Sequence, residues 1–297
     1  MAVSARNYNR VIDLTLYTSD NKMVAIKCPE HGRKPAIEIN GTFYDNGTLP
    51  AFNVTIKNLY LDIKDQNYTR LRVKAGYVDG TKNTFEGSIM SLYQESPGPE
   101  GQTVIQCYLG QFQNWLDKSI DLNYDAGAQL ETILNDIQAT LGASGVRMGQ
   151  YKAKYLQLKD RFEWNGTARG ALNKLQQDLA DSQLNVFIRN NYICAICAPG
   201  SDYINAHDLE YLSAPPQENV GGEDGAYYTT VTAPWNPELQ IGDILRIPSK
   251  VYIRNLVQVG GSKKTQTIQV TKIQFQFATT GSANNMTVQG FNVSGGN

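Results

Sequence analysis

The chain is poor in the residues that many enzymes use for catalysis. Its 297 residues include only two histidines and four cysteines, and charged side chains make up 19%. Nucleophilic triads and most general-base mechanisms need a positioned histidine. His31 lies in a loop rich in proline, glycine and lysine, without a nucleophile-elbow serine, and His207 lies in a segment that we interpret as a surface turn. The sequence therefore favours a protein that is not an enzyme.

The chain also lacks an excess of charge of either sign and any long apolar run. It has 27 basic and 28 acidic residues and a net charge of −1, which argues against an extended phosphate-binding face. No apolar run reaches the length of a transmembrane helix, and the N-terminal MAVSARNYNR lacks the apolar stretch of a signal peptide. We therefore expect no membrane segment and synthesis in a cytoplasm.

The cysteines offer the ligands of a zinc site but not its geometry. CPEH at 28–31 and CAIC at 194–197 could together supply four ligands, and Cys107 lies in a further apolar strand. Cys194 and Cys197 lie in a predicted strand, where a spacing of three points side chains to opposite faces. Because zinc ligands must converge, we interpret the cysteines as buried free thiols and expect no metal and no cofactor.

Three other groups could carry chemistry, and each has a simpler interpretation. A glycosidase pair could come from acidic residues that also fit solvated helix faces or turns. GGSKKT at 260–265 lies between predicted strands and reads as a hairpin loop, not a phosphate cradle. Basic residues that alternate with apolar ones could bind nucleic acid, but such alternation is more typical of the solvent-exposed face of a strand. The acidic residues are Asp160, Glu163, Asp178 and Asp181, and the basic ones are Arg70, Arg72 and Lys74.

Alternation of apolar and polar residues dominates the first third of the chain. Phe52, Val54 and Ile56 alternate strictly with polar residues, and similar short runs recur between turn signals over residues 11–93. Short, evenly spaced strands predict a barrel or sandwich. Near the C-terminus the buried phase shifts between Val270 and Ile273, which predicts a β-bulge or a sharp bend near 271–272.

The middle of the chain changes to helical periodicity. Apolar residues at helical spacing predict helices over 130–141 and 168–179, the first ending at Gly142 and the second capped by Thr167. Residues 184–197 then predict a hairpin that turns at Asn190–Asn191. Residues 213–225 read as a linker or long loop before strands resume. The predicted class is α+β, mainly β.

Three stretches, taken in order, resemble the tail hub (late control protein D-like) family of contractile-tailed phages and related injection systems. The first is LRVKAGYVDGTKNTFEGSIMSLY at 71–93, with an Ala-Gly-Tyr strand end and a returning Phe-x-Gly-x-Ile. The second is the helix and hairpin at 165–196, and the third is NPELQIGD at 236–243, which stands where the family enters its final barrel. The motif residues are Ala75, Gly76, Tyr77, Phe85, Gly87, Ile89, Pro234, Trp235, Pro237, Gly242 and Asp243.

The resemblance implies a specific architecture and role. It implies two tube-like β-barrel domains, at 1–118 and 213–297, joined by an α/β region with two helices and a hairpin at 119–212. Three copies of two similar barrels would imitate six-fold symmetry, so that a homotrimeric ring joins a six-fold tail tube to a three-fold central spike. The implied partners are the tube, spike and other baseplate proteins, with DNA passing through the channel without specific binding. The implied location is the virion tail or baseplate, assembled in the bacterial host cytoplasm.

Two other classes of function compete with this interpretation. A carbohydrate- or receptor-binding module of a tail tip would use exposed aromatics, so Trp115, Trp164 and Trp235 would face solvent. A cell-wall hydrolase would need a pair of the carboxylates named above. In the hub interpretation, Pro234 and Pro237 keep the chain extended, the Gly-Asp pair at 242–243 makes a turn, and Trp235 is buried at the barrel end.

Overall fold

The computed structural model describes residues 9–29, 35–44, 51–59, 67–78, 82–95, 101–109, 117–189, 192–197, 201–209, 212–213, 216–221, 226–247, 250–251, 259–260 and 266–293. These residues form mostly strands, with two α-helices, which confirms the predicted mainly β class. The strands of the first half are β1 (Arg10–Thr18), β2 (Met23–Ile26), β3 (Ile37–Tyr44), β4 (Ala51–Lys57), β5 (Tyr68–Tyr77), β6 (Lys82–Glu95), β7 (Gln102–Leu109), β8 (Ser119–Tyr124) and β9 (Gly145–Met148).

The remaining elements follow in the same order. They are α2 (Leu130–Leu141), β10 (Phe162–Thr167), α3 (Ala168–Asp178), β11 (Leu184–Arg189), β12 (Tyr192–Cys197), β13 (Ala206–Asp208), β14 (Gln217–Gly221), β15 (Ala226–Ala233), β16 (Ile244–Ile247), β17 (Lys250–Val251), β18 (Val259–Gly260), β19 (Gln266–Ala278) and β20 (Asn284–Asn292), with 3-10 turns η2 (Ala153–Tyr155) and η3 (Ala180–Ser182).

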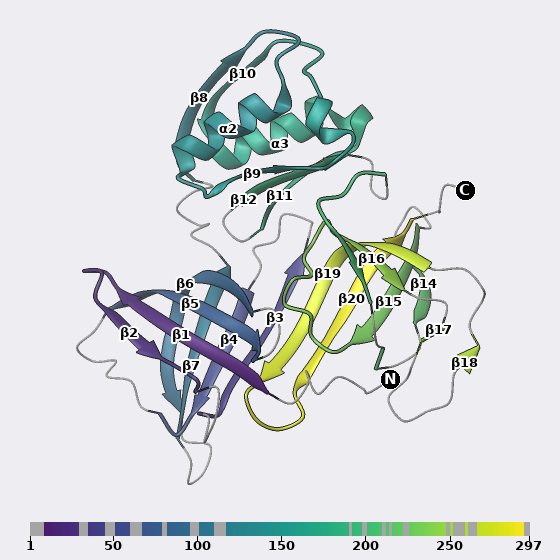
Figure 1. The fold of residues 1–297 in the computed structure, drawn as a ribbon. Helices are drawn as coiled ribbons and strands as arrows, with labels where there is room; N and C mark the ends of the chain where they lie inside the picture. The colour runs from purple at the N-terminus through teal and green to yellow at the C-terminus, as the bar shows by residue number, and fades with distance from the viewer. Residues whose placement is uncertain are drawn as a thin grey trace.

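One large sheet joins strands from both ends of the chain. Its order is β14-β15-β20-β19-β3-β4-β7-β6-β5-β1-β2, with β16 also pairing with β19 and β13 with β16 (Figure 1). The sheet consists of two blocks of strands, the first block β1–β7 and the last block β13–β16, β19 and β20. The two blocks meet where β19 pairs antiparallel with β3, with Phe275 opposite Gly41. Sequence patterning predicts the strands but cannot predict this pairing, because it joins segments more than 200 residues apart.

The large sheet curls, and its first strands reach the turn between β19 and β20. Arg10 of β1 donates from Nη1 to the carbonyl oxygen of Ala283 and from Nη2 to that of Gly281, both at 2.5 Å. The hydroxyl of Tyr77 on β5 lies 2.8 Å from Oδ1 of Asn284. Side chains of β1 and β5 therefore bind this turn, in addition to the backbone ladder between β3 and β19.

The apolar side of the curled sheet forms the main core. Strict alternation along β4 buries Phe52, Val54 and Ile56, because successive side chains point to opposite faces. The predicted bulge in β19 is confirmed, since its register against β20 shifts between Val270 and Lys272. The extra residue returns the apolar side chains to the buried face after the shift in phase.

A smaller α/β unit lies beside the large sheet with a core of its own. Its two helices lie between the β8–β10 pair and the three-stranded sheet of β9, β12 and β11 (Figure 1). Both predicted helix ends are confirmed. The Thr167 hydroxyl accepts a hydrogen bond from the Gly170 amide at the start of α3, and Gly142 is left-handed at the end of α2, with φ of 76°.

The structure corrects part of the sequence interpretation. The segment 213–225, predicted as a linker or loop, contains β14, because its backbone pairs with β15 from Gln217 opposite Thr230 onward. The hairpin of β11 and β12 is confirmed by antiparallel pairing, while its turn at 190–191 lies outside the described residues. Within the described ranges, no helix is both long and apolar enough to cross a bilayer.

Candidate functional site

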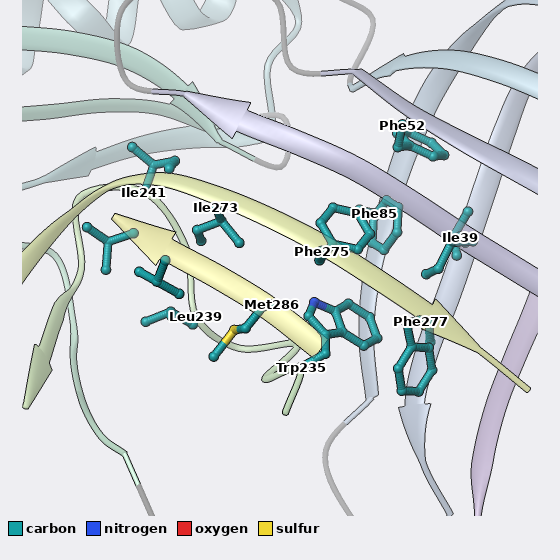
Figure 2. Packing of buried hydrophobic residues seen from close by; sticks show 14 of the residues in the cluster. Ile39, Phe52, Phe85, Trp235, Leu239, Ile241, Ile273, Phe275, Phe277 and Met286 are labelled. Atoms are coloured by element: carbon teal, nitrogen blue, oxygen red, sulfur yellow. The ribbon is translucent and has the colours of Figure 1, made fainter. Parts of the chain in front are cut away.

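Three of the motif aromatics come together from distant parts of the sequence. Phe85, from the first block of strands, packs on Phe275 of β19, and Trp235, from the last third of the chain, packs on Phe275 and Phe277 (Figure 2). Tyr77 of β5 packs on Phe277, with ring centroids 5.6 Å apart. The Trp235 ring centroid lies 4.4 Å from that of Phe277 and stacks on Phe275 at 5.6 Å, with an interplanar angle of 17°. Trp235 is only 6% exposed, which confirms the burial expected in the hub interpretation.

A hydrogen bond also connects two members of this aromatic cluster, Tyr77 and Trp235. The Tyr77 hydroxyl lies 3.0 Å from the backbone carbonyl oxygen of Trp235 and 2.8 Å from Oδ1 of Asn284. Burial raises the pKa of Tyr77, so the phenol stays protonated and can donate. The Ala-Gly-Tyr and Pro-Trp motifs, which sequence reasoning treated separately, are therefore parts of one contact.

Two motif glycines are required by close packing. A Cβ on Gly87 would lie 2.6 Å from the Tyr108 carbonyl oxygen and 2.6 Å from the Phe52 ring. Gly242 has φ of 81°, and a Cβ there would lie 2.6 Å from the Phe187 ring. Positive φ and close approach both favour glycine. Gly242 therefore lets the turn before β16 pack against β11 of the α/β unit.

The other motif residues have structural positions. Ala75 is buried in β5, and Gly76 lies opposite Val11 of β1 in the ladder. Ile89 is half-buried beside a register shift in β6. Pro234 and Pro237 lie in the irregular run between β15 and β16, where Pro234 is at a bend and Pro237 is in a turn, so the chain is not extended through both prolines.

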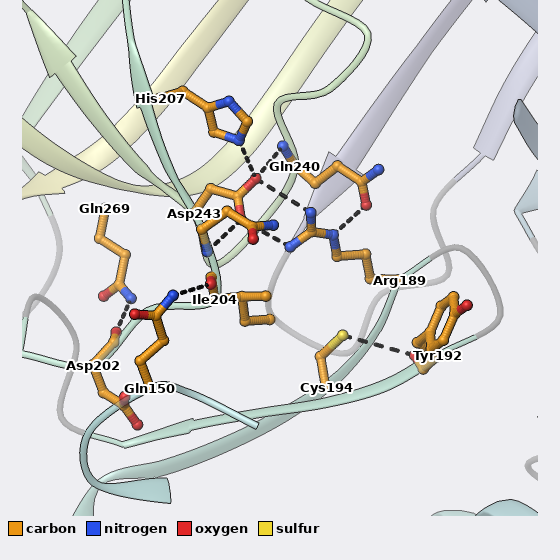
Figure 3. A network of polar contacts seen from close by, with 11 residues as sticks. Gln150, Arg189, Tyr192, Cys194, Asp202, Ile204, His207, Gln240, Asp243 and Gln269 are labelled. Carbon is orange, nitrogen blue, oxygen red and sulfur yellow. Dashed lines mark hydrogen bonds and ion pairs between the residues drawn. The ribbon is translucent and has the colours of Figure 1, made fainter. Parts of the chain in front are cut away.

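Asp243 is the centre of a buried network that the sequence did not reveal (Figure 3). Its side chain is fully buried and pairs with Arg189 of β11, whose Nη1 and Nη2 lie 2.8 and 3.3 Å from Oδ1 and Oδ2. The backbone amides of Asn205 and Gln240 donate to the same carboxylate at 3.2 and 2.9 Å. His207 Nε2 lies 3.1 Å from Oδ2.

This network joins the α/β unit to the large sheet. Arg189 ends β11, whereas Asp243 immediately precedes β16, and the Arg189 Nε also donates to the Gln240 side chain. Bidentate arginine–carboxylate pairs fix orientation as well as distance, and removing one partner from a buried pair is costly. The Gly-Asp pair therefore does more than form the predicted turn, because its carboxylate also anchors the neighbouring unit.

The prediction that His207 lies in a surface turn is wrong. His207 lies in β13, parallel to β16, and its side chain is only 16% exposed. The sequence around it is short and polar, and the strand forms because β16 supplies its pairing partner. Neither Arg189 nor His207 is marked by a local motif, since the carboxylate that they share lies 54 and 36 residues away along the chain.

Asp202 makes a second buried contact nearby. Its carboxylate accepts from the backbone amides of Tyr151, Ala153 and Cys197 at 2.9, 2.9 and 3.1 Å. Its carbonyl oxygen accepts from the Gln269 side chain of β19 at 2.6 Å (Figure 3). Hydrogen bonds of Asp202 thus connect the α/β unit to β19 of the large sheet.

The cysteines have the environment of inert structural thiols. Cys194 packs in the main core and Cys197 in the core of the α/β unit, so the prediction that they point to opposite faces is confirmed. Burial raises the pKa of Cys194 to about 12 and that of Cys197 to about 11. The described residues contain no cluster of three or more metal-ligating side chains, and His31 lies outside them.

The remaining candidate charges lie on the surface. Three of the four acidic candidates are exposed and ion-paired, Glu163 with Arg161, Asp178 with Lys174 and Asp181 with Lys159, and Asp160 is exposed.

The basic stripe is a strand face, as its alternation predicts. Arg70 and Arg72 both approach Glu86, with Arg72 Nε 2.5 Å from Oε1, and Arg70 lies 4.2 Å over the ring of Tyr17. Trp164 is half-buried, and its indole donates to the Thr167 carbonyl, while Trp115 lies outside the described residues.

Known structures share this fold across nearly the whole chain. The tail protein from Neisseria meningitidis MC58 matches with a TM-score of 0.57 and 8% identity, over 97% of each chain. The 43 kDa tail protein of prophage MuSo2 from Shewanella oneidensis matches with 0.56 and 9%, over 94% of this chain and 96% of that one. The E. coli c3393 protein, described as a component of the type VI secretion system with structural similarity to T4 bacteriophage tail proteins gp27 and gp5, matches with 0.54 and 10%, over 88% and 74%.

Sequence comparison finds no such match. No protein-family profile matches the chain, and no curated protein matches it. At about 10% identity, the likeness to solved structures shows a shared fold.

Proposed function

We propose that this chain is a structural tail protein, and specifically a trimeric hub that joins a six-fold tail tube to a three-fold central spike. The observation that carries the proposal is the shared fold with two tail proteins, one of them from a prophage, and a secretion-system component, over 88–97% of this chain. The order of the three motif stretches supports the same assignment. We also propose that its location is the virion tail or baseplate.

We further propose that the two blocks of strands act as two tube-like domains, at 1–118 and 213–297. The pairing of β19 with β3 supports the idea that the two blocks occupy successive positions along one curved wall. Three chains, each supplying two such blocks, would present six similar positions to a tube. The region 119–212 would lie beside this wall, anchored by the Arg189–Asp243 pair.

The proposed mechanism is geometric rather than catalytic. A protein that joins two symmetries must keep its parts at fixed angles, and buried bidentate ion pairs restrict rotation between packed units. The network around Asp243 would serve this purpose. DNA would pass through the ring without specific binding, and the tube, spike and other baseplate proteins would be the partners.

A direct measurement of assembly tests the hub proposal. Mass photometry of the purified protein should show a species of three times the 32.9 kDa chain mass, and electron microscopy should show a three-fold ring with a central channel. A folded protein that stays monomeric at micromolar concentration would contradict the proposal. Binding of polysaccharide by that monomer would instead favour the tip-binding alternative.

A further inference from the structure

The segment between β9 and β10 of the α/β unit presents tyrosines to solvent. Tyr151 is 54% exposed, and Tyr155, at the end of η2, is 70% exposed. The Tyr151 ring packs edge-on against Tyr203, with centroids 5.5 Å apart, and the two hydroxyl oxygens lie 3.3 Å apart. These three tyrosines, with Lys152 and Lys154, are called the tyrosine patch below. Exposed aromatic side chains of this kind are typical anchors of protein interfaces.

Buried polar groups fix the backbone under the patch. The fully buried Asp202 accepts hydrogen bonds from the backbone amides of Tyr151 and Ala153, both at 2.9 Å. Asp202 immediately precedes Tyr203, whose carbonyl oxygen accepts from the Gln150 amide at 3.1 Å. One buried carboxylate therefore positions both chain segments that carry the tyrosines. A surface that is already ordered loses less conformational entropy on binding, so this arrangement favours affinity.

The surroundings of the patch are basic. Residues 137–159 contain no aspartate or glutamate, although the whole chain carries 27 basic and 28 acidic residues. Lys152 and Lys154 are exposed, and Nζ of Lys154 lies 6.0 Å from the ring centroid of Tyr155. The carboxylate of Asp202 is buried and points to backbone amides rather than to solvent. The patch is therefore complementary to an anionic ligand.

The arrangement of the rings favours an acidic protein segment over other anionic ligands. Single-stranded nucleic acids bind aromatic faces on which successive bases stack. Tyr151 and Tyr203 instead meet at an interplanar angle of 61°, and their hydroxyls contact each other. Acidic side chains of a protein segment would pair with the lysines while apolar side chains cover the tyrosine rings. Aromatic anchors with a charged rim have the usual anatomy of a protein interface.

We propose that the tyrosine patch is the docking site for an acidic segment of another tail protein. This inference rests on the proposed function, and it names the surface and the chemistry by which one partner is held. Lys152 and Lys154 would pair with carboxylates of the segment, and Tyr151 and Tyr155 would pack against its apolar side chains. In the proposed ring the α/β unit lies beside the wall, so the patch is separate from the strands that form the wall.

A double charge reversal tests the proposal. The probe is a fluorescein-labelled peptide of glutamate and leucine, and fluorescence anisotropy follows its binding to the full chain. The peptide should bind the wild type, and Lys152→Glu combined with Lys154→Glu should raise the Kd by about tenfold or more. The matched control, Lys57→Glu combined with Lys74→Glu, reverses two exposed lysines of the large sheet and should leave the Kd unchanged.

Two further measurements separate the charge of the patch from its rings. Replacing glutamate by glutamine in the peptide should abolish binding, because the lysines then have no counter-charge. Tyr155→Ser should weaken binding without changing the charge of the protein, because it removes an exposed ring. Circular dichroism checks that each variant is folded.

Several outcomes would overturn the assignment. They are a glutamate peptide that shows no saturable binding, and an equal loss of affinity in both double variants. Oligothymidylate that binds in place of the peptide, and is lost in Lys152→Glu combined with Lys154→Glu, would assign the patch to nucleic acid instead.

Mass photometry of the same samples keeps this inference distinct from the proposed function. The Lys152→Glu and Lys154→Glu double variant should assemble like the wild type. A wild type that assembles but does not bind the peptide would refute the docking site while the ring stands. A wild type that binds the peptide through the patch but stays monomeric would refute the ring while the docking site stands.

Discussion

The buried carboxylate of Asp243 provides the sharpest test of how the two units are joined. Oδ1 accepts from Arg189 and the Asn205 amide, and Oδ2 accepts from Arg189 and the Gln240 amide. In Asp243→Asn, either orientation of the new amide directs its NH₂ group at two N–H donors. The substitution also leaves the Arg189 guanidinium, whose side chain is 5% exposed, without its counter-charge.

This loss is expected to be large. Removing one partner of a buried ion pair typically costs about 3–5 kcal/mol, because the remaining charge stays desolvated. Urea denaturation followed by tryptophan fluorescence should therefore show a clearly lower midpoint for Asp243→Asn. The matched control is Asp181→Asn, which removes an exposed carboxylate paired with Lys159 and should leave the midpoint unchanged.

A double variant checks that the effect comes from the pair. Arg189→Met combined with Asp243→Asn should cost less than the sum of the two single changes, because the second change removes the charge that the first left unpaired. A loss below about 1 kcal/mol in Asp243→Asn, against the range expected for a buried pair, would refute the assignment of this network as a structural anchor.

Two substitutions probe the core, and two measurements probe the thiols. Trp235→Ala should destabilise the fold by about 3–5 kcal/mol in urea unfolding, and a loss typical of a surface site would contradict its packing on Phe275. Gly87→Ala should lower the melting temperature, since its Cβ would lie 2.6 Å from the Tyr108 carbonyl oxygen, an overpacking that costs about 1–3 kcal/mol. Burial raises the pKa of Cys194 from about 9 to about 12, so the unfolded chain ionises first and stability should fall as pH rises through this window, as pH-dependent urea midpoints would show. Ellman's reagent at pH 8 should leave the buried thiols unreacted until urea unfolds the chain, and rapid reaction of the folded protein would contradict their burial.

Local patterns predicted the secondary structure well where one period dominates. The alternation along β4 and the helical stripe of α2 each indicate one buried face. The phase shift near residue 271 predicted the bulge in β19, because an extended strand cannot change its buried face without an extra residue. β14 was missed because its polar, proline-preceded sequence resembles a loop and becomes a strand only beside β15.

The sequence predicted some residues of the candidate site but not the residues that they contact. Resemblance to a family marked Tyr77, Trp235 and Asp243, and the conformational need at Gly242 followed from residue type. The partners of these residues could not be predicted, because Arg189 and His207 carry no local signature and meet Asp243 only after the chain folds.

The sequence by itself determined the mainly β class, the two helices with their caps, the bulge and the buried phase of most strands. Each of these follows from interactions between residues close in the chain, where periodicity and turn chemistry act directly. The tertiary structure alone decided that β19 pairs with β3, that Tyr77 meets Trp235, and that a buried ion pair joins the two units. These contacts link segments 54 or more residues apart, and their free energy depends on burial and geometry that no local pattern encodes.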